Sequence, residues 1–365
     1  MPPHLDGSQI RLIVFDLDGV ITDERPYWDS AREAVREIQA GLVASRSVCE
    51  GLPESLLYWL KNRAVNSNWD VAFVAVCAAL YSSGRNLDLV ALGRIGARFP
   101  NGSAQAADGV PHWSGRQQGP DAFFDPATPT GAELIRYAGV KLASVLPPEI
   151  RYIVEYGGPL WDLCQRRCQE IHNFRMLSGT AKHTSVLGQE RVVEILSELR
   201  VNCGCCLGVA TGRPKQEAMD ALNDLGLLPF FDPNRIVTHN DVADAQRILG
   251  TSGKPSQLGK PHPFILLRAI YPDLALHTLL GQSIVLENHA WVAFVGDTLS
   301  DVLAAKAARA WSLCVVGAVA NPVARQERRE QLLASGCDLV LDSIAELPPV
   351  MLSNHQRTGW NEKHS

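Results

Sequence analysis

An apolar run that ends in two closely spaced acids constrains the fold of this chain more than any other feature. Residues 12–15 read Leu-Ile-Val-Phe, and Asp16, Asp18 and Gly19 follow at once. Residues i and i+2 of a strand point to the same side, so both acids are expected to emerge together where Gly19 lets the backbone turn. Two carboxylates at one strand end are costly unless a cation or a reaction uses them. The alternative is a polar strand end before a turn.

The composition allows one large core or two domains and argues against several classes of function. The chain has 365 residues, of which 46% are hydrophobic. Its formal net charge of -5 predicts no broad basic face, which disfavours nucleic-acid binding. No apolar run is long enough to span a bilayer, and residues 1–7 lack a signal-peptide pattern. The nine scattered cysteines are an odd number, which favours free thiols and a cytoplasmic protein.

The order of the predicted elements indicates a discontinuous α/β domain with a helical insertion. Residues 9–22 and 188–348 alternate between apolar strands and helices, which predicts a doubly wound, Rossmann-like parallel sheet covered on both faces. Residues 23–187 show helical spacing, so we expect a large α-helical cap domain inserted after the first strand. Within it, the Gly- and Pro-rich residues 100–131 are predicted to form a long loop. Residues 349–365 are predicted to be a polar C-terminal tail.

Polar residues also mark the ends of later elements in the predicted sheet domain. Thr211 and Gly212 follow one strand, Lys260 precedes a helix, and Asp297 and Asp301 follow another strand. Ligand sites of open parallel sheets lie at the carboxyl ends of the strands, so these residues are expected at one edge. Each also has an ordinary structural explanation: a helix N-cap for Thr211, a solvated charge for Lys260, and helix capping for the two acids.

Taken in order, these residues resemble the four motifs of the haloacid dehalogenase superfamily of phosphatases. The matching segments are Asp16-Leu17-Asp18-Gly19-Val20, Ala210-Thr211-Gly212-Arg213-Pro214, Lys260-Pro261-His262-Pro263 and Gly296-Asp297-Thr298-Leu299-Ser300-Asp301. The resemblance covers residues 9–20 and about 188–348, and residues 336–347 resemble the family's last strand and helix. The inserted region resembles the family's cap in position only, because it carries no recognisable cap motif.

The resemblance implies distinct roles for the acids, and their chemistry supports these roles. Asp16 would attack phosphorus and form an aspartyl-phosphate. Asp18 would protonate the leaving oxygen and then deprotonate water. Mg²⁺ would be held by Asp16, Asp297 and Asp301, with the backbone carbonyl of Asp18, because this ion prefers hard oxygen ligands.

The resemblance also implies a phosphate-binding set and argues against one family activity. Thr211, Gly212 and Lys260 would bind phosphoryl oxygens and stabilise the charge of the transition state. Asp18 argues against dehalogenation, because a halide leaves without a proton and the family's dehalogenases lack this second acid. A phosphatase or another phosphoryl-transfer enzyme is therefore expected.

Two departures from the family pattern affect the third motif. Lys254-Pro255 lies six residues before Lys260-Pro261 and offers a second match. Lys260 is preferred because its neighbours Gly259, His262 and Pro263 match more of the motif. The stretch from Lys260 to Asp297 is long for the family, so residues 276–289 are predicted to be an extra loop.

Two sets of cysteines do not favour a metal site. Cys164, Cys168 and His172 share one helical face. Together with the cysteines of the segment 203–206 they could be drawn as a zinc site, but the spacing matches no recognised zinc pattern. Buried free thiols are the simpler interpretation.

Two basic residues of the inserted region are candidate contacts to an anionic substrate. Arg175 and Lys182 are singled out from a basic group, although such charges more often form a solvated helix face. The tryptophans of the same region are expected to pack the core of the cap.

We therefore expect a cytoplasmic, Mg²⁺-dependent phosphatase that hydrolyses a small phosphorylated metabolite, with no nucleic-acid or membrane partner. Its cap would exclude water and select the leaving group. A sugar phosphomutase of the same superfamily is one alternative, since residues 16–23 resemble that branch too. A non-catalytic protein that binds a phosphate ligand is another. The sequence names neither the substrate nor the oligomeric state.

Overall fold

The structure is a computed structural model, and it divides into two compact units. It describes residues 6–43, 51–65, 67–83, 86–97, 123–124, 128–251, 257–281, 284, 287–319 and 322–352. One unit comprises residues 1–24 and 183–365, and the other comprises residues 25–182. The sequence interpretation placed the corresponding junctions after residues 22 and 187.

A six-stranded parallel sheet forms the centre of the first unit, in the order β3-β2-β1-β4-β5-β6. The strands are β1 (Leu12–Phe15), β2 (Cys206–Ala210), β3 (Ile236–Val237), β4 (His289–Gly296), β5 (Ala310–Val315) and β6 (Leu339–Leu341). Phe15, the last residue of β1, lies between Val209 and Val295. The predicted α/β class with a parallel sheet is confirmed.

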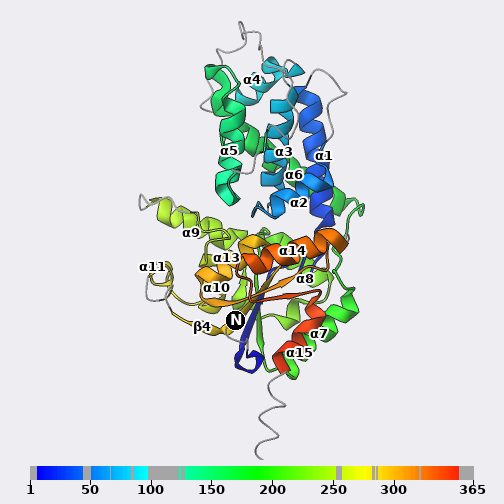
Figure 1. The fold of residues 1–365 in the computed structure, drawn as a ribbon, viewed down its shortest axis with the longest axis vertical. Helices are drawn as coiled ribbons and strands as arrows, with labels where there is room; N and C mark the ends of the chain where they lie inside the picture. Colours follow the sequence, from blue (N-terminus) through cyan, green and yellow to red (C-terminus); the bar gives the residue numbers. More distant parts are fainter. Residues whose placement is uncertain are drawn as a thin grey trace, which may run out of the picture. The chain divides into compact units, whose positions relative to one another are not determined.

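Helices cover both faces of this sheet. They are α7 (Gln189–Val201), α8 (Lys215–Asp224), α9 (His239–Thr251), α10 (Phe264–Ile270), α11 (Leu276–Leu279), α13 (Leu299–Ala307), α14 (Pro322–Ala334) and α15 (Leu347–Leu352). Short 3-10 turns lie at Gly7–Gln9, Leu228–Phe230, Pro233–Arg235 and Ile344–Glu346. Figure 1 shows α7 and α15 side by side, and the two helices are in contact.

The continuous apolar run of β1 follows from this double covering. Ile13 and Phe15 pack in one core cluster with residues of α7 and α8. Leu12 and Val14 pack in another cluster with residues of α9, α10 and α13. A strand that is buried on both faces needs apolar residues at every position, and not at alternate ones.

The structure corrects several predicted elements of this unit. The strand β3 and the helix α9 were not predicted from the sequence. Residues 349–352 belong to α15, and Met351 is buried in the core, so the predicted polar tail began too early. Residues 353–365 lie outside the described residues. The predicted extra loop at 276–289 contains α11, and part of it also lies outside them.

The second unit is helical. It contains α1 (Arg25–Leu42), α2 (Glu54–Lys61), α3 (Asn68–Ser83), α4 (Leu89–Ala97), α5 (Gly131–Ala143), a 3-10 segment at Pro148–Val154 and α6 (Pro159–Leu177). Figure 1 shows α1, α3, α5 and α6 as a bundle, in which α3 contacts the other three. Most of α3 is buried, which explains its nearly uninterrupted apolar sequence.

Four of the tryptophans that were predicted to pack the cap core contribute to the core of the helical unit. Trp28 is buried there, and Trp59, Trp69 and Trp161 are partly buried against the same cluster. Trp113 and most of the predicted loop at 100–131 lie outside the described residues. None of the helices in the described part of the chain is long and apolar enough to cross a membrane.

Candidate active site

Asp16 lies directly at the carboxyl end of β1, in the middle of the sheet. Its backbone N–H donates to Val295 O of the neighbouring strand at 2.9 Å, so the residue is fixed by the sheet itself. Its Oδ1 accepts the Leu17 N–H at 2.8 Å. The chain then turns tightly, because the backbone N–H groups of Val20, Ile21 and Thr22 all donate to Leu17 O. The strand end therefore holds a buried carboxylate in a defined position.

Asp297 and Asp301 come from the junction between β4 and α13. Oδ2 of Asp301 accepts three hydrogen bonds, from Asp297 N at 3.2 Å, Thr298 N at 2.9 Å and Thr298 Oγ1 at 2.6 Å. This is a capping box that closes the first turn of α13. Asp301 therefore does cap the helix α13, as its alternative interpretation predicted. Capping uses only one of its two carboxylate oxygens, Oδ2.

Lys260 joins the two strand ends. Its Nζ donates to Asp16 Oδ2 at 2.7 Å and to Asp301 Oδ1 at 2.8 Å, and its side chain is buried. Lys260 is therefore not the solvated surface charge that was its alternative interpretation. The competing Lys254-Pro255 match lies outside the described residues.

Burial and mutual charge set the protonation of these three groups. Burial raises the pKa of Asp16 to about 7, against the opposing effect of Lys260. Burial also acts to lower the pKa of Lys260, but Asp16 and Asp301 outweigh it, so this pKa lies above its ordinary value. For Asp301, Lys260 and Thr298 outweigh burial and lower the pKa. Lys260 and Asp301 thus form a charged pair, and a further cation would favour the charged form of Asp16.

Two glycines make room for the acids. Gly19 has φ +74°, and a Cβ atom there would lie 2.6 Å from Asp297 Oδ2. A Cβ atom at Gly296 would overlap the side chain of Asp301. The turn after β1 therefore lies closer to Asp297, and the end of β4 lies closer to Asp301, than a side chain at either glycine would allow.

Asp16, Asp297 and Asp301 form a group that could hold a metal ion. Each offers one carboxylate oxygen, and these oxygens lie within 4.8 Å of one another. All three residues are buried. Three convergent carboxylates are a donor set that fits Mg²⁺, which prefers hard oxygen ligands. The carboxylate of Asp18 is not a member of this group.

Asp18 is instead paired with Arg213, a residue that the sequence interpretation quoted in a motif but gave no role. Arg213 Nε lies 3.1 Å from Asp18 Oδ1 and 3.0 Å from Oδ2, and Arg213 Nη2 also donates to Oδ1. The guanidinium is buried, whereas the Asp18 side chain is 28% exposed. The local sequence carries no signal for this pairing, because the two residues are brought together only by the neighbouring strands β1 and β2.

Thr211 and Gly212 lie at the end of β2, beside β1. Thr211 is buried, its N–H donates to Val237 O at 3.0 Å, and its Oγ1 accepts the Arg213 N–H at 3.2 Å. Gly212 is exposed, and a Cβ atom there would meet nothing within 4 Å. The Thr211 hydroxyl thus shapes the turn that places Arg213, while contact of either residue with phosphate stays a prediction.

Arg328 is the second functional candidate that sequence reasoning missed. This buried residue of α14 donates from Nε to Asp297 O at 3.1 Å and from Nη2 to Asp297 Oδ2 at 3.1 Å. Its Nη2 also donates to Asp297 O. Nothing in the local sequence distinguishes Arg328 from the arginines beside it, so only the fold could identify it.

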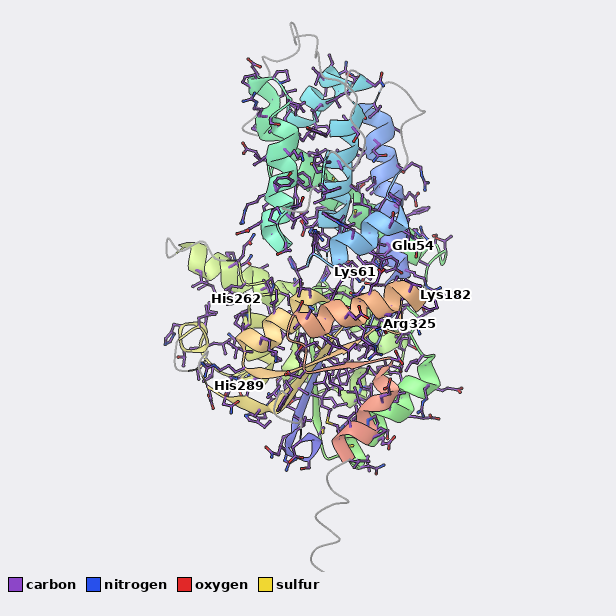
Figure 2. All side chains as sticks on the ribbon, in the orientation of Figure 1. Glu54, Lys61, Lys182, His262, His289 and Arg325 are labelled. Carbon is purple, nitrogen blue, oxygen red and sulfur yellow. The ribbon has the colours of Figure 1, made fainter. Side chains whose placement is uncertain are left out.

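The two substrate contacts proposed in the helical unit have other surroundings. Arg175 pairs with Asp29 at 3.1 Å and with Glu33 at 3.7 Å, both on α1. Lys182, labelled in Figure 2, is exposed. Their contact with a substrate stays a prediction.

The cysteine sets are not arranged as a metal site. Within the described residues, no cysteine or histidine belongs to a group close enough to hold an ion. Cys164 and Cys168 are buried thiols, and burial raises the pKa of both. His172 stacks on Tyr27, with ring centroids 4.1 Å apart. The interpretation of these residues as packing is consistent with these contacts.

Comparisons with known proteins support the fold. No family model matches the chain, and no curated protein matches it. A structural-genomics target solved by X-ray crystallography is similar, with 22% identity, a TM-score of 0.60, and coverage of 95% of this chain and 100% of that one.

Two further solved structures are similar at lower scores. A haloacid dehalogenase-like protein of unknown function from Agrobacterium tumefaciens has 15% identity and a TM-score of 0.46, covering 94% of this chain and 98% of its own. A haloacid dehalogenase hydrolase from Entamoeba histolytica has 13% identity and a TM-score of 0.47, with 94% and 99% covered. The likeness to the structural-genomics target shows a shared fold over nearly the whole of both chains, and membership of the haloacid dehalogenase superfamily stays the expectation that the motifs give.

Proposed function

We propose that this protein is a Mg²⁺-dependent phosphatase that hydrolyses a small phosphomonoester through an aspartyl-phosphate on Asp16. The observation that carries the proposal is the convergence of Asp16, Asp297, Asp301 and Lys260 at one edge of the sheet. Sheet-edge sites of this kind are where open parallel sheets bind ligands. Four buried charged groups in one place are costly unless they serve a ligand or a reaction.

In this proposal the protein's own residues divide the reaction into two steps. A carboxylate oxygen of Asp16 attacks phosphorus, and Asp18 donates a proton to the leaving oxygen as the ester bond breaks. Asp18 then takes a proton from water, whose oxygen attacks the aspartyl-phosphate and releases inorganic phosphate and free Asp16. Lys260 and the Thr211 turn would hold phosphoryl oxygens and stabilise the charge that develops on them.

The ion would be held by Asp16, Asp297 and Asp301. When bound, Mg²⁺ offsets the repulsion between an anionic nucleophile and an anionic substrate. Lys260 and Arg328 already balance part of the negative charge of these acids. This balance supports a site that is formed before the ion binds.

Release of phosphate from a panel of small phosphomonoesters, measured with and without Mg²⁺, tests the proposal. Asp16→Asn should abolish turnover, because the amide is a poor nucleophile. Asp220→Asn is the matched control: this acid accepts a hydrogen bond from Gln216 on α8 and belongs to no part of the site. The control should keep wild-type turnover. Full activity of Asp16→Asn would exclude the assigned nucleophile.

Product analysis separates hydrolysis from its alternatives. Inorganic phosphate as the product supports a phosphatase, whereas an isomerised sugar phosphate supports a phosphomutase. Binding of Mg²⁺ without turnover of any substrate in a broad panel supports a protein that only binds a phosphate ligand.

A further inference from the structure

Asp297 is held by Arg328, a buried arginine of α14, which is the helix that connects β5 to β6. Arg328 contacts this residue at both its main-chain oxygen and its side-chain Oδ2. The exposed fraction of either side chain is about one-twentieth, since the values are 5% for Arg328 and 6% for Asp297. Because the rigid guanidinium of Arg328 binds both O and Oδ2 of Asp297, the Asp297 side chain has little freedom to rotate.

The other arginines of α14 show that this contact is specific to one position. Arg325, labelled in Figure 2, donates from Nε to Val319 O at 2.9 Å. Arg329 donates to Val340 O at 2.6 Å and to Asp342 Oδ1 at 2.7 Å. Both neighbours bind loop or sheet-edge groups away from the three-acid cluster. Arg328 alone among these three contacts a member of that cluster.

The contact bears on how Asp297 can bind a cation. A carboxylate oxygen engaged by a guanidinium is poorly placed to bind an ion at the same time, so Asp297 is restricted to one-oxygen ligation. Mg²⁺ demands near-octahedral geometry and fits such ligands. Ca²⁺ is larger, takes more oxygens and readily uses both oxygens of one carboxylate.

We propose that Arg328 is a positioning residue that holds Asp297 as a one-oxygen ligand and so makes the site select Mg²⁺ over Ca²⁺. The inference rests on the proposed function, in which Asp297 binds the ion. Arg328 itself touches neither the ion nor the substrate in this proposal. It acts through the orientation of Asp297, in the way that outer hydrogen-bond partners of metal ligands generally do.

Titration calorimetry of the metal-free full-length protein with Mg²⁺ and separately with Ca²⁺ tests this role. In Arg328→Gln, Mg²⁺ affinity should fall by about 10- to 100-fold, the usual effect of losing a ligand's outer partner. Ca²⁺ affinity should fall far less, because Asp297 regains its second oxygen. The Mg²⁺/Ca²⁺ affinity ratio should therefore drop. Arg325→Gln, the same change three residues earlier on α14, should leave both affinities and their ratio at wild-type values.

A second variant covers the case in which Arg328→Gln does not fold. Arg328→Lys keeps the charge but lacks the planar guanidinium that binds the two Asp297 oxygens. Its Mg²⁺/Ca²⁺ affinity ratio should therefore be lower than that of the wild type but still favour Mg²⁺. Equal losses of Mg²⁺ and Ca²⁺ affinity in either variant would assign Arg328 a purely structural role and overturn the inference. Unchanged affinities would overturn it too.

Failure of the proposed function gives a different result. In that case wild-type protein binds no Mg²⁺, or Asp297→Asn binds Mg²⁺ as tightly as wild type. If the wild type binds Mg²⁺ and Asp297→Asn does not, the metal site stands, and the Arg328 variants alone decide the inference.

Discussion

Arg213 binds both carboxylate oxygens of Asp18 and so ties the turn after β1 to the turn after β2. The same guanidinium donates from Nη2 to Thr22 Oγ1 at 2.5 Å, and Thr22 Oγ1 donates to Leu17 O at 3.0 Å. The acid assigned to proton transfer is thus held from a neighbouring strand, by a residue that is itself buried. Its position depends on Arg213 as much as on its own backbone.

Arg213→Met is therefore expected to impair catalysis. Misplacement of a reacting group by about an ångström can cost about 100-fold in rate, so kcat should fall by about that factor. Loss of the contacts that the buried Arg213 makes with Asp18 and Thr22 should also lower the unfolding free energy. Steady-state phosphate release and denaturant unfolding measure the two effects.

A structural arginine of the same unit is the control for that change. Arg235 donates to Ala269 O and Ile270 O and pairs with Asp232, away from the acids. Arg235→Met should lower stability and leave kcat within about twofold of wild type, as expected for loss of structural contacts alone. If Arg213→Met kept the kcat of the Arg235 variant, Arg213 would have no part in placing Asp18.

Metal removal should abolish turnover and lower stability. Treatment with EDTA followed by excess Mg²⁺ should remove and then restore phosphate release. An ion that binds only the folded protein stabilises it by about 2.7 kcal/mol at 100 times its Kd, so the thermal midpoint should rise with Mg²⁺ concentration. Asp297→Asn, measured in parallel, should show little of this rise. If the thermal midpoint of the wild type did not change with Mg²⁺ concentration, the three-acid cluster would not be a metal site.

The sequence predicted the residues of the site wherever they sit at strand ends. Asp16, Asp297 and Asp301 follow runs of buried apolar residues, and such runs mark strands in a sheet covered on both faces. The carboxyl ends of parallel strands meet at one edge, so spacing along the chain was enough to place these acids together. Lys260 was harder, because nothing local distinguishes a buried lysine from a solvated one.

The two arginines could not be predicted in the same way. Arg213 is adjacent to a predicted residue, but its partner Asp18 is 195 positions away in the sequence. Arg328 lies on an amphipathic helix next to Arg329, and only the packing of α14 decides which of them faces inward. Counter-charges for buried acids are set by tertiary packing, which a single sequence does not encode in local pattern.

The two missed elements, β3 and α9, differ in whether the sequence carried a signal for them. β3 has only two residues, Ile236 and Val237, which is too short for a periodic signal. For α9, a start signal existed: the Thr238 N–H and hydroxyl both donate to Asp241 Oδ2, a capping arrangement with the spacing of a capping box. The helix was therefore open to prediction from residues 238–241.

A partly buried acid in the helical unit, Asp70, gives a pH-dependent stability. Burial raises the pKa of Asp70, although hydrogen bonds from Ser67 and from Trp161 Nε1 at 2.7 Å oppose the shift. The folded state therefore holds this proton more tightly than the unfolded chain, whose Asp pKa is about 3.9. The contribution is fully present below that value and is lost as pH rises through the folded pKa.

Asp70→Asn isolates this effect, because the amide does not titrate. The unfolding free energy of wild type minus that of Asp70→Asn should decrease as pH rises above about 4. Denaturant unfolding of both proteins at a series of pH values measures the difference. A difference that increased with pH would show that the carboxylate form is the one stabilised at this position.

Gly19→Ala is expected to disturb the metal site through backbone and contact together. A left-handed φ costs a non-glycine residue about 1–2 kcal/mol. At Gly19 the added methyl group would also lie 2.6 Å from Asp297 Oδ2, the oxygen that Arg328 holds. Gly204 has a similar φ of +67° with nothing within 4 Å of its Cβ position. Gly204→Ala should therefore lower the free energy of unfolding and leave Mg²⁺ affinity unchanged. Gly19→Ala should lower both the free energy of unfolding and the Mg²⁺ affinity measured by calorimetry. Equal Mg²⁺ affinities in the two variants would mean that the turn after β1 shifts to accommodate the methyl group and leaves Asp297 in place.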